Sequence, residues 1–254
     1  MQLGCVTYNV LKSLDLEAII ALLEKTGLAA VELRTGHKHG VEPSLDAPAR
    51  ERVKQRFEKS QVRLLSFGTE CEFQSPDPAV RRKNIEDAET FIRLAHDTGA
   101  RAIKVRPNGV PKDKSISLDT TIRNIGNSLH EVGDIGNRFG VQIWMEVHDN
   151  VTSNPPVAER ILKTADHKNV GACWNSNPVD VVNGSVKPSF DLLGPFVRNC
   201  HIHDLFDSYP YRELFALLNR SGYQGYTLCE AAESPQPERF LRYYKALWTE
   251  LNRA

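Results

Sequence analysis

The stretch Ile143-Trp144-Met145-Glu146-Val147-His148-Asp149 joins an apolar, strand-like run to a carboxylate and an imidazole. Three later apolar runs end in a similar way, at Asn175, His201 and Glu230. From Glu146 onward these positions are spaced by 29, 26 and 29 residues. A parallel strand, its crossover helix and two connections need about 30 residues. The spacing therefore predicts four metal-capable side chains at the C-terminal ends of four successive β/α units.

The rest of the chain continues the same alternation of strand-like and helix-like segments. Strands are predicted at residues 3–8, 30–34, 62–67, 102–106, 142–147, 170–174, 197–202 and 226–229. Helical periodicity lies between them, and no linker or composition break interrupts the 254 residues. In the first helical segment, residues 14–23, Asp15 is the expected N-terminal cap and Gly27 the stop, and a short helical turn is expected at residues 190–193. A closed (β/α)8 TIM barrel typically takes about 250 residues. We therefore predict an α/β fold, a (β/α)8 TIM barrel forming a single domain over residues 1–254. An open dinucleotide-binding sheet is disfavoured, because no glycine-rich fingerprint follows the first strand.

Composition narrows the classes of partner. Lys+Arg and Asp+Glu both number 32, and the resulting zero net charge argues against a nucleic-acid partner. No apolar run approaches the roughly 18 to 20 residues of a membrane span, and the N-terminus does not resemble a signal peptide. The five cysteines show no CxxC spacing and are interpreted as small buried residues in a reducing compartment. We expect a cytoplasmic protein with no membrane partner, and a homo-oligomer is possible.

The chemistry of the strand ends favours a metal. A single His or Glu at a strand end is more often a satisfied polar residue than a ligand. Carboxylates that converge on one barrel mouth repel one another unless a cation or a shared proton relieves them. Glu146, Asn175, His201 and Glu230 together supply mostly oxygen and one imidazole. This set suits Mn²⁺, Mg²⁺, Co²⁺ or Fe²⁺ better than structural zinc.

These motifs carry a family resemblance over essentially the whole chain. The chain resembles the xylose isomerase-like barrels, a sugar isomerase/epimerase superfamily that also contains tagatose 3-epimerase-like enzymes and inosose dehydratases. The most specific strings are Met145-Glu146-Val147-His148, Cys173-Trp174-Asn175-Ser176-Asn177, His201-Ile202-His203-Asp204 and Cys229-Glu230. The resemblance implies that the four strand-end residues hold one divalent metal and that Glu146 and Glu230 move the substrate's protons.

One position departs from the family pattern. At the ligand position that ends the sixth strand, the family usually has Asp, with His two or three residues later. This chain has Asn175 and Asn177 there. An amide oxygen can bind a metal but brings no charge, so the metal is expected to be held more weakly, or the site to favour a harder cation. Loss of the metal is the other reading of Asn175.

Further residues are expected to bind substrate at the same mouth. They are His37, Glu70, Lys104, Arg106, His148, Trp174, Asn177 and His203. Two of them have equally ordinary explanations: Trp174 as barrel packing, and Lys104 as a salt bridge to Glu70 or Glu146. We also expect Asp204 to support His201, and burial to raise the pKa values of the catalytic carboxylates.

The chemistry that fits this site is proton transfer alpha to a carbonyl through an enediolate, as in a metal-dependent sugar isomerase or epimerase. A lyase or dehydratase acting on a keto-sugar or keto-glycoside would use the same groups. A non-catalytic sugar-binding barrel is the second alternative. An endonuclease-type phosphodiesterase of the same fold is disfavoured by the zero net charge and by the two asparagines.

Overall fold

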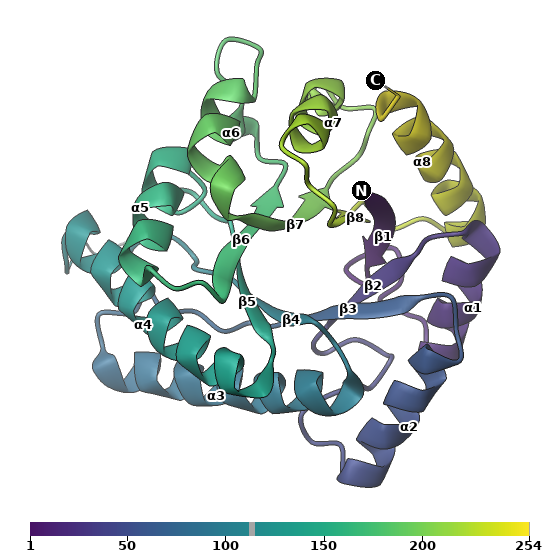
Figure 1. Cartoon of the computed structure of the whole chain (residues 1–254), viewed down its shortest axis with the longest axis horizontal. Helices are drawn as coiled ribbons and strands as arrows, with labels where there is room; N and C mark the ends of the chain where they lie inside the picture. The colour runs from purple at the N-terminus through teal and green to yellow at the C-terminus, as the bar shows by residue number, and fades with distance from the viewer. Residues whose placement is uncertain (112–114, 254) are drawn as a thin grey trace.

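Eight parallel strands form one closed barrel in the computed structural model, which describes residues 1–111 and 115–253 (Figure 1). Neighbouring strands follow chain order, and β8 closes the barrel against β1. The strands are β1 (Gln2–Val6), β2 (Ala30–Arg34), β3 (Arg63–Gly68), β4 (Ala102–Val105), β5 (Gln142–Glu146), β6 (Val170–Asn175), β7 (Val197–Ile202) and β8 (Tyr226–Cys229). The predicted single-domain (β/α)8 barrel is confirmed.

The helices form a ring outside the strands (Figure 1). They are α1 (Leu16–Thr26), α2 (Ala47–Glu58), α3 (Pro78–Thr98), α4 (Leu118–Phe139), α5 (Pro155–Ala165), α6 (Lys187–Leu193), α7 (Tyr211–Arg220) and α8 (Pro237–Leu251). Two short 3-10 turns, Pro178–Asp180 and Gly194–Phe196, flank α6. The α6 helix begins three residues before the predicted helical turn at Phe190, because Pro188 occupies its first turn, where no backbone N–H is required.

Local capping sets the helix ends that the sequence predicts. The Asp15 side chain accepts a hydrogen bond of 2.9 Å from the backbone N–H of Ala18 and so caps α1. Gly27 then ends α1 in the left-handed region at φ 70°. Asp15 as the start and Gly27 as the stop of this helix are both confirmed.

Side chains alternate along each strand and divide the interior into two regions. Inside the barrel, the lower part is apolar and contains Val6, Ala30, Leu65, Ala102, Trp144, Cys173 and Leu228. A larger apolar layer includes residues of both strands and surrounding helices. All five cysteines are buried and free, which agrees with their interpretation as small core residues. The apolar floor leaves the polar side chains to gather at the C-terminal strand ends.

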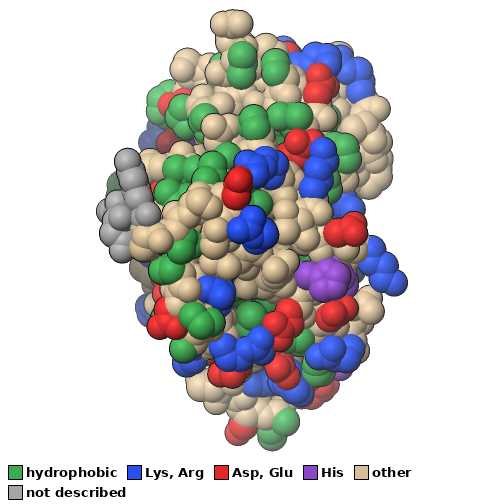
Figure 2. All heavy atoms as spheres, turned by 90° about the vertical axis from the view of Figure 1, so that its left-hand side faces the viewer, with side chains coloured by type: hydrophobic (Ala, Val, Ile, Leu, Met, Phe, Trp, Pro, Cys, Tyr) green, Lys and Arg blue, Asp and Glu red, His purple; other side chains and the backbone are tan. Residues whose placement is uncertain are grey.

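The outer surface carries charges of both signs. On the face in Figure 2, which is the left-hand side of Figure 1, acidic and basic side chains are intermingled. Among the described residues, no helix is both long enough and apolar enough to cross a membrane.

Barrel closure provides a test of this packing. A Cβ added at Gly4 in β1 would lie 2.6 Å from Leu228 Cδ2 and 2.7 Å from the carbonyl oxygen of Ala30. We therefore expect Gly4→Ala to lower the free energy of unfolding by about 1–3 kcal/mol, because the closing strands cannot move apart without breaking their ladders. Urea unfolding measures this change. Gln2→Ala, an exposed change in the same strand, is the control and should stay within about 0.5 kcal/mol. An unchanged midpoint for Gly4→Ala would contradict this account of the closure.

Candidate metal centre

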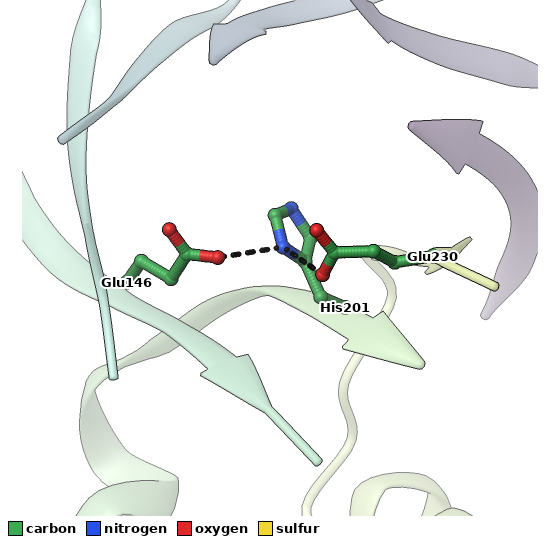
Figure 3. Close-up of side chains that lie close together, drawn as sticks. All are labelled: Glu146, His201 and Glu230. Carbon is green, nitrogen blue, oxygen red and sulfur yellow. Dashed lines mark hydrogen bonds and ion pairs between the residues drawn. The ribbon is translucent and has the colours of Figure 1, made fainter. Parts of the chain in front are cut away.

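Three of the four expected ligands converge at the C-terminal end of the barrel. Glu146 ends β5, His201 lies in β7, and Glu230 directly follows β8. His201 Nδ1 lies 3.2 Å from Glu146 Oε1 and 3.0 Å from Glu230 Oε2 (Figure 3). One ligand atom from each residue lies within 4.8 Å of the others. Residues up to 84 positions apart in the chain are thus brought to one point by the closed sheet.

The separations fit a divalent cation. Metal bonds to His nitrogen and carboxylate oxygen are about 2.0–2.2 Å long. Two such bonds meeting at a tetrahedral or octahedral angle put the two ligand atoms about 3.0–3.4 Å apart. The distances from His201 Nδ1 to Glu146 and Glu230, 3.2 and 3.0 Å, lie in that range.

The fourth expected ligand, Asn175, has an unused oxygen. Asn175 ends β6 beside His201 in the strand register, and its side chain is buried. Its Oδ1 has no hydrogen-bond partner in the part of the chain that the structure describes. A buried amide oxygen without a partner is unfavourable, so this atom is available to bind a cation. The residues present therefore fit a divalent metal with three protein oxygens, one of them neutral, and one imidazole.

A residue outside the predicted set holds the other side of the imidazole. Glu32 Oε1 lies 3.3 Å from His201 Nε2, and both side chains are fully buried. Ser66 donates a hydrogen bond of 2.7 Å to Glu32 Oε2. The ring partner is therefore Glu32, not the expected Asp204. The period-two pattern of β2 carried the signal, because it places Ala30, Glu32 and Arg34 on the barrel-facing side.

Lys104 belongs to the same cluster. Its Nζ lies 2.6 Å from Glu146 Oε2, and both side chains are about 95% buried. This is the salt bridge considered as the alternative for Lys104. Burial by itself would raise the pKa of Glu146, but Lys104 and His201 hold it well below its usual range. The net pKa shift of this carboxyl is therefore opposite to the expected rise, because the sequence did not reveal how closely its cationic partner approaches.

The neighbouring groups also set the protonation state of His201. Burial would lower the pKa of the His201 imidazole, but Cys173, Glu230 and Glu32 raise it well above its usual range. Burial likewise works against the ammonium of Lys104, whereas Glu146 and Glu32 raise its pKa. The pKa of Glu32 is lowered by His201 in spite of its burial. The cluster is thus a network of opposed charges.

A cavity of about 90 Å³ opens above this network. It is lined by Val6, Tyr8, Glu32, Arg34, Lys104, Arg106, Glu146, His148 and Glu230. Its volume equals about three water molecules. Three of the expected substrate-binding residues, Lys104, Arg106 and His148, line it, and Glu70 contacts Arg34 and Arg106 at 2.8 and 3.7 Å.

Two expected residues lie near the cavity without lining it. His203 Nε2 is 3.8 Å from Glu230 Oε2, and the side chain is 35% exposed. His37 Nδ1 lies 2.9 Å from Thr7 Oγ1, and the ring stacks on Tyr8. Partial burial, together with the nearby Arg34, lowers the pKa of His37 to about 4, so it is neutral at pH 7.

Two further expected residues are turned away from the carboxylates. Trp174 is buried beside Phe190, and its indole N–H donates to Tyr209 Oη at 3.0 Å. This position favours the barrel-packing explanation of Trp174. Asn177 uses its side-chain amide to donate to the carbonyl of Val147 at 2.7 Å, so it connects two strand-end loops.

A model of the xylose isomerase-like TIM barrel family matches residues 20–246. The chain therefore belongs to this family, as the sequence motifs indicate. No curated protein matches the chain significantly.

Solved structures share the fold over the whole chain at low identity. D-psicose 3-epimerase from Clostridium cellulolyticum H10 superposes with a TM-score of 0.86 at 14% identity, covering 100% of both chains. The IolI protein, solved with a bound zinc atom, has a TM-score of 0.79 at 17% identity and covers 99% of this chain and 96% of its own. The probable 3-DHS dehydratase AsbF from Bacillus anthracis has a TM-score of 0.74 at 13% identity, with coverages of 98% and 99%. These likenesses establish the barrel.

The loop after β6 gives a prediction of pH dependence. Tyr209 Oη donates to Asp180 Oδ2 at 2.9 Å, and the carboxyl is buried. Burial raises the pKa of Asp180 from 3.8 to about 7. Between these values the folded chain holds a proton that the unfolded chain has released, so stability falls as the pH rises.

We expect Asp180→Asn to be more stable than the wild type at pH 8, by at most about 4 kcal/mol, and equally stable near pH 4. The amide keeps an acceptor for Tyr209 and carries no charge. Chemical unfolding across this pH range measures the difference. Asp191→Asn, which removes a carboxylate that is 57% exposed on α6, is the control and should show no such trend. A constant difference between Asp180→Asn and the wild type would refute the assignment.

Proposed function

We propose that this protein is a divalent-metal-dependent sugar isomerase or epimerase that moves a proton alpha to a carbonyl. The observation that carries the proposal is the placement of His201 Nδ1 between the carboxylates of Glu146 and Glu230, at the base of a cavity. Glu146, Asn175, His201 and Glu230 would hold one Mn²⁺, Mg²⁺ or Co²⁺ ion. The fold shared with D-psicose 3-epimerase supports the same reaction class.

The chain's own residues define the proton path. One carboxylate, Glu146 or Glu230, removes the proton from the carbon next to the carbonyl; the electron pair of that C–H bond forms a C=C bond, and the π pair of the carbonyl moves onto its oxygen to give an enediolate. The other residue, on the opposite side of the substrate and in its protonated form, returns a proton. A bound divalent cation supplies Lewis-acid stabilisation of the negative oxygen. Return to the opposite face gives an epimer, and return to the neighbouring carbon gives an isomer.

Lys104 controls when Glu146 can act. While its ammonium lies 2.6 Å from Glu146 Oε2, that carboxylate is a weak base. A substrate oxygen entering the cavity offers the ammonium another partner, which raises the proton affinity of Glu146 and places a positive charge where the enediolate oxygen forms. His148, His37 and His203 would bind hydroxyl groups of the substrate.

Elimination is the second candidate reaction. His203 lies 3.8 Å from Glu230 and is 35% exposed. Burial lowers the pKa of its imidazole, so His203 would relay to a leaving group beta to the carbonyl the proton that Glu230 has taken from the α-carbon. The dehydratase fold among the neighbours is compatible with this outcome. A barrel that binds a sugar without turnover is the third outcome that the experiments below separate.

Metal content tests the ligand set. We expect about one metal per chain after incubation with Mn²⁺ and desalting, and loss of that metal in Glu230→Gln, because a carboxylate ligand is replaced by an amide. Elemental analysis measures both. Glu233→Gln, which removes an exposed carboxylate nearby, should bind like the wild type. Absence of metal from the wild-type protein would instead support the interpretation that Asn175 marks the loss of the metal site.

The Glu32 contact gives a graded prediction. Glu32→Gln should weaken Mn²⁺ affinity by about 10- to 100-fold, because the carboxylate that orients the His201 ring is lost. Calorimetric titration measures the affinity, and saturating Mn²⁺ should still give about one ion per chain. Equal affinities would show that the imidazole does not depend on Glu32.

Solvent hydrogen exchange tests the chemistry. Incubation of a ketose panel with the enzyme in D₂O should place deuterium at the carbon next to the carbonyl, and Glu230→Gln should slow this by at least about 100-fold, because an acid–base group and a metal ligand are lost together. Mass spectrometry detects the label. An enone absorbance from keto-glycosides would support elimination instead, and a ligand that binds without exchange would show a binding protein.

A further inference from the structure

Two arginines meet on one side of the cavity. Arg34 ends β2 and Arg106 directly follows β4, so they flank the intervening strand β3. Both line the cavity, and both point to Glu70, which follows β3: its Oε1 is 2.8 Å from Arg34 Nη2 and 3.7 Å from Arg106 Nη2. A single carboxylate therefore bridges two guanidinium groups at the rim.

The ion pairs with Glu70 satisfy only part of the hydrogen-bonding capacity of these two guanidinium groups. The Glu70 side chain is 60% exposed, whereas those of Arg34 and Arg106 are only 17% and 23% exposed. An ion pair with such a water-exposed carboxylate contributes little to the stability of the folded protein. Arg106 Nε is buried and has no hydrogen-bond partner among the described residues. A buried donor without a partner is costly, so Arg106 has a donor ready for an incoming acceptor.

Arg34 is held in place independently of Glu70. Its Nη1 donates to the carbonyl of Thr35 at 3.2 Å, and its guanidinium lies 5.5 Å from the centre of the Tyr8 ring. A guanidinium that is already oriented loses less freedom when it binds an anion. Arg34 can therefore exchange one carboxylate for another without rearranging.

The carboxylates deeper in the cavity do not compete for the arginines. Glu146 is paired with Lys104 at 2.6 Å. Glu32 accepts from Ser66 and faces His201. Glu230 is 3.0 Å from His201 Nδ1. Within residues 1–111 and 115–253, the carboxylate paired with both arginines is that of Glu70, the most exposed of these acids.

We propose that the substrate carries an anionic group, a carboxylate or a phosphate, that displaces Glu70 and binds Arg34 and Arg106 together. Planar guanidinium groups suit the paired oxygens of either anion. The inference rests on the proposed function in taking this cavity as the sugar site. It orients the substrate, with the anionic end at the β2–β4 rim and the reacting carbon toward Glu146 and Glu230.

Calorimetric titration with three probes tests this proposal: D-fructose, D-fructose 6-phosphate and 5-keto-D-gluconate. At least one anionic probe should bind the wild-type protein about tenfold more tightly than D-fructose, as expected for added charged hydrogen bonds. Preference for the phosphate ester would identify a sugar phosphate, and preference for the keto acid would identify a sugar acid. Equal binding of all three, or binding of none, would overturn the proposal.

Variants of the rim separate the mechanism from general charge effects. Arg34→Met and Arg106→Met should each abolish the anion preference, measured as the ratio of the anionic-probe affinity to the D-fructose affinity of the same variant. Arg138→Met, which removes an exposed arginine near the end of α4, should preserve the preference. Glu70→Gln removes the competing carboxylate at an exposed position and should tighten anion binding about threefold or more. An anion preference that survives in both arginine variants, or weaker anion binding in Glu70→Gln, would refute the proposed anion site.

The test of anion binding can succeed or fail independently of the deuterium-exchange test of the proposed reaction. Anion preference without deuterium exchange would retain this binding site and reject the proposed chemistry. Exchange on neutral ketoses without anion preference would retain the chemistry and reject this substrate class.

Discussion

The structure depends on placing several charges together where water is excluded. His201 is fully buried and has carboxylates on both ring nitrogens, with Glu32 on one side and Glu146 and Glu230 on the other. Each of these charges alone would carry a large desolvation cost. They are tolerable only because the closed barrel brings the ends of β2, β4, β5, β7 and β8 to within hydrogen-bond distance. A shift of one residue in any of these strands would turn its charged side chain out of the barrel.

This constraint connects the fold to the site. The apolar floor formed by residues such as Trp144, Cys173 and Leu228 closes the barrel below the charged layer. The charges therefore face one another, the Ser66 hydroxyl and the cavity above. A rigid sheet carries the chemically active groups, while the loops that follow the strands carry Glu70 and His37, where exchange of partners is easier. The site thus combines a fixed centre with an adaptable rim.

Much of this arrangement could be predicted from the sequence, and the limits have physical causes. The even spacing from Glu146 to Glu230 predicted the barrel, and the capping signals at Asp15 and Gly27 predicted the ends of a helix. Period-two alternation could have identified Glu32 as an inward residue, but no local pattern states which ring nitrogen it faces. Trp174 illustrates the converse, since a residue next to a ligand in sequence points to the other side of the strand.

Distances between strands are the other limit. The pairing of Lys104 with Glu146 reverses the expected direction of the Glu146 pKa shift, and it depends on two side chains 42 residues apart meeting at 2.6 Å. The contact of Glu70 with both Arg34 and Arg106 likewise depends on the order of strands around the barrel. Sequence indicates which groups share a mouth, and only the closed sheet indicates which ones touch.

Anomalous X-ray diffraction from crystals grown with Mn²⁺ tests the central claim most directly. The account predicts one anomalous peak bounded by His201 Nδ1, the carboxylates of Glu146 and Glu230, and Asn175 Oδ1. A fully ordered centre without a peak, with the ammonium of Lys104 and a protonated His201 balancing the carboxylates, would contradict it.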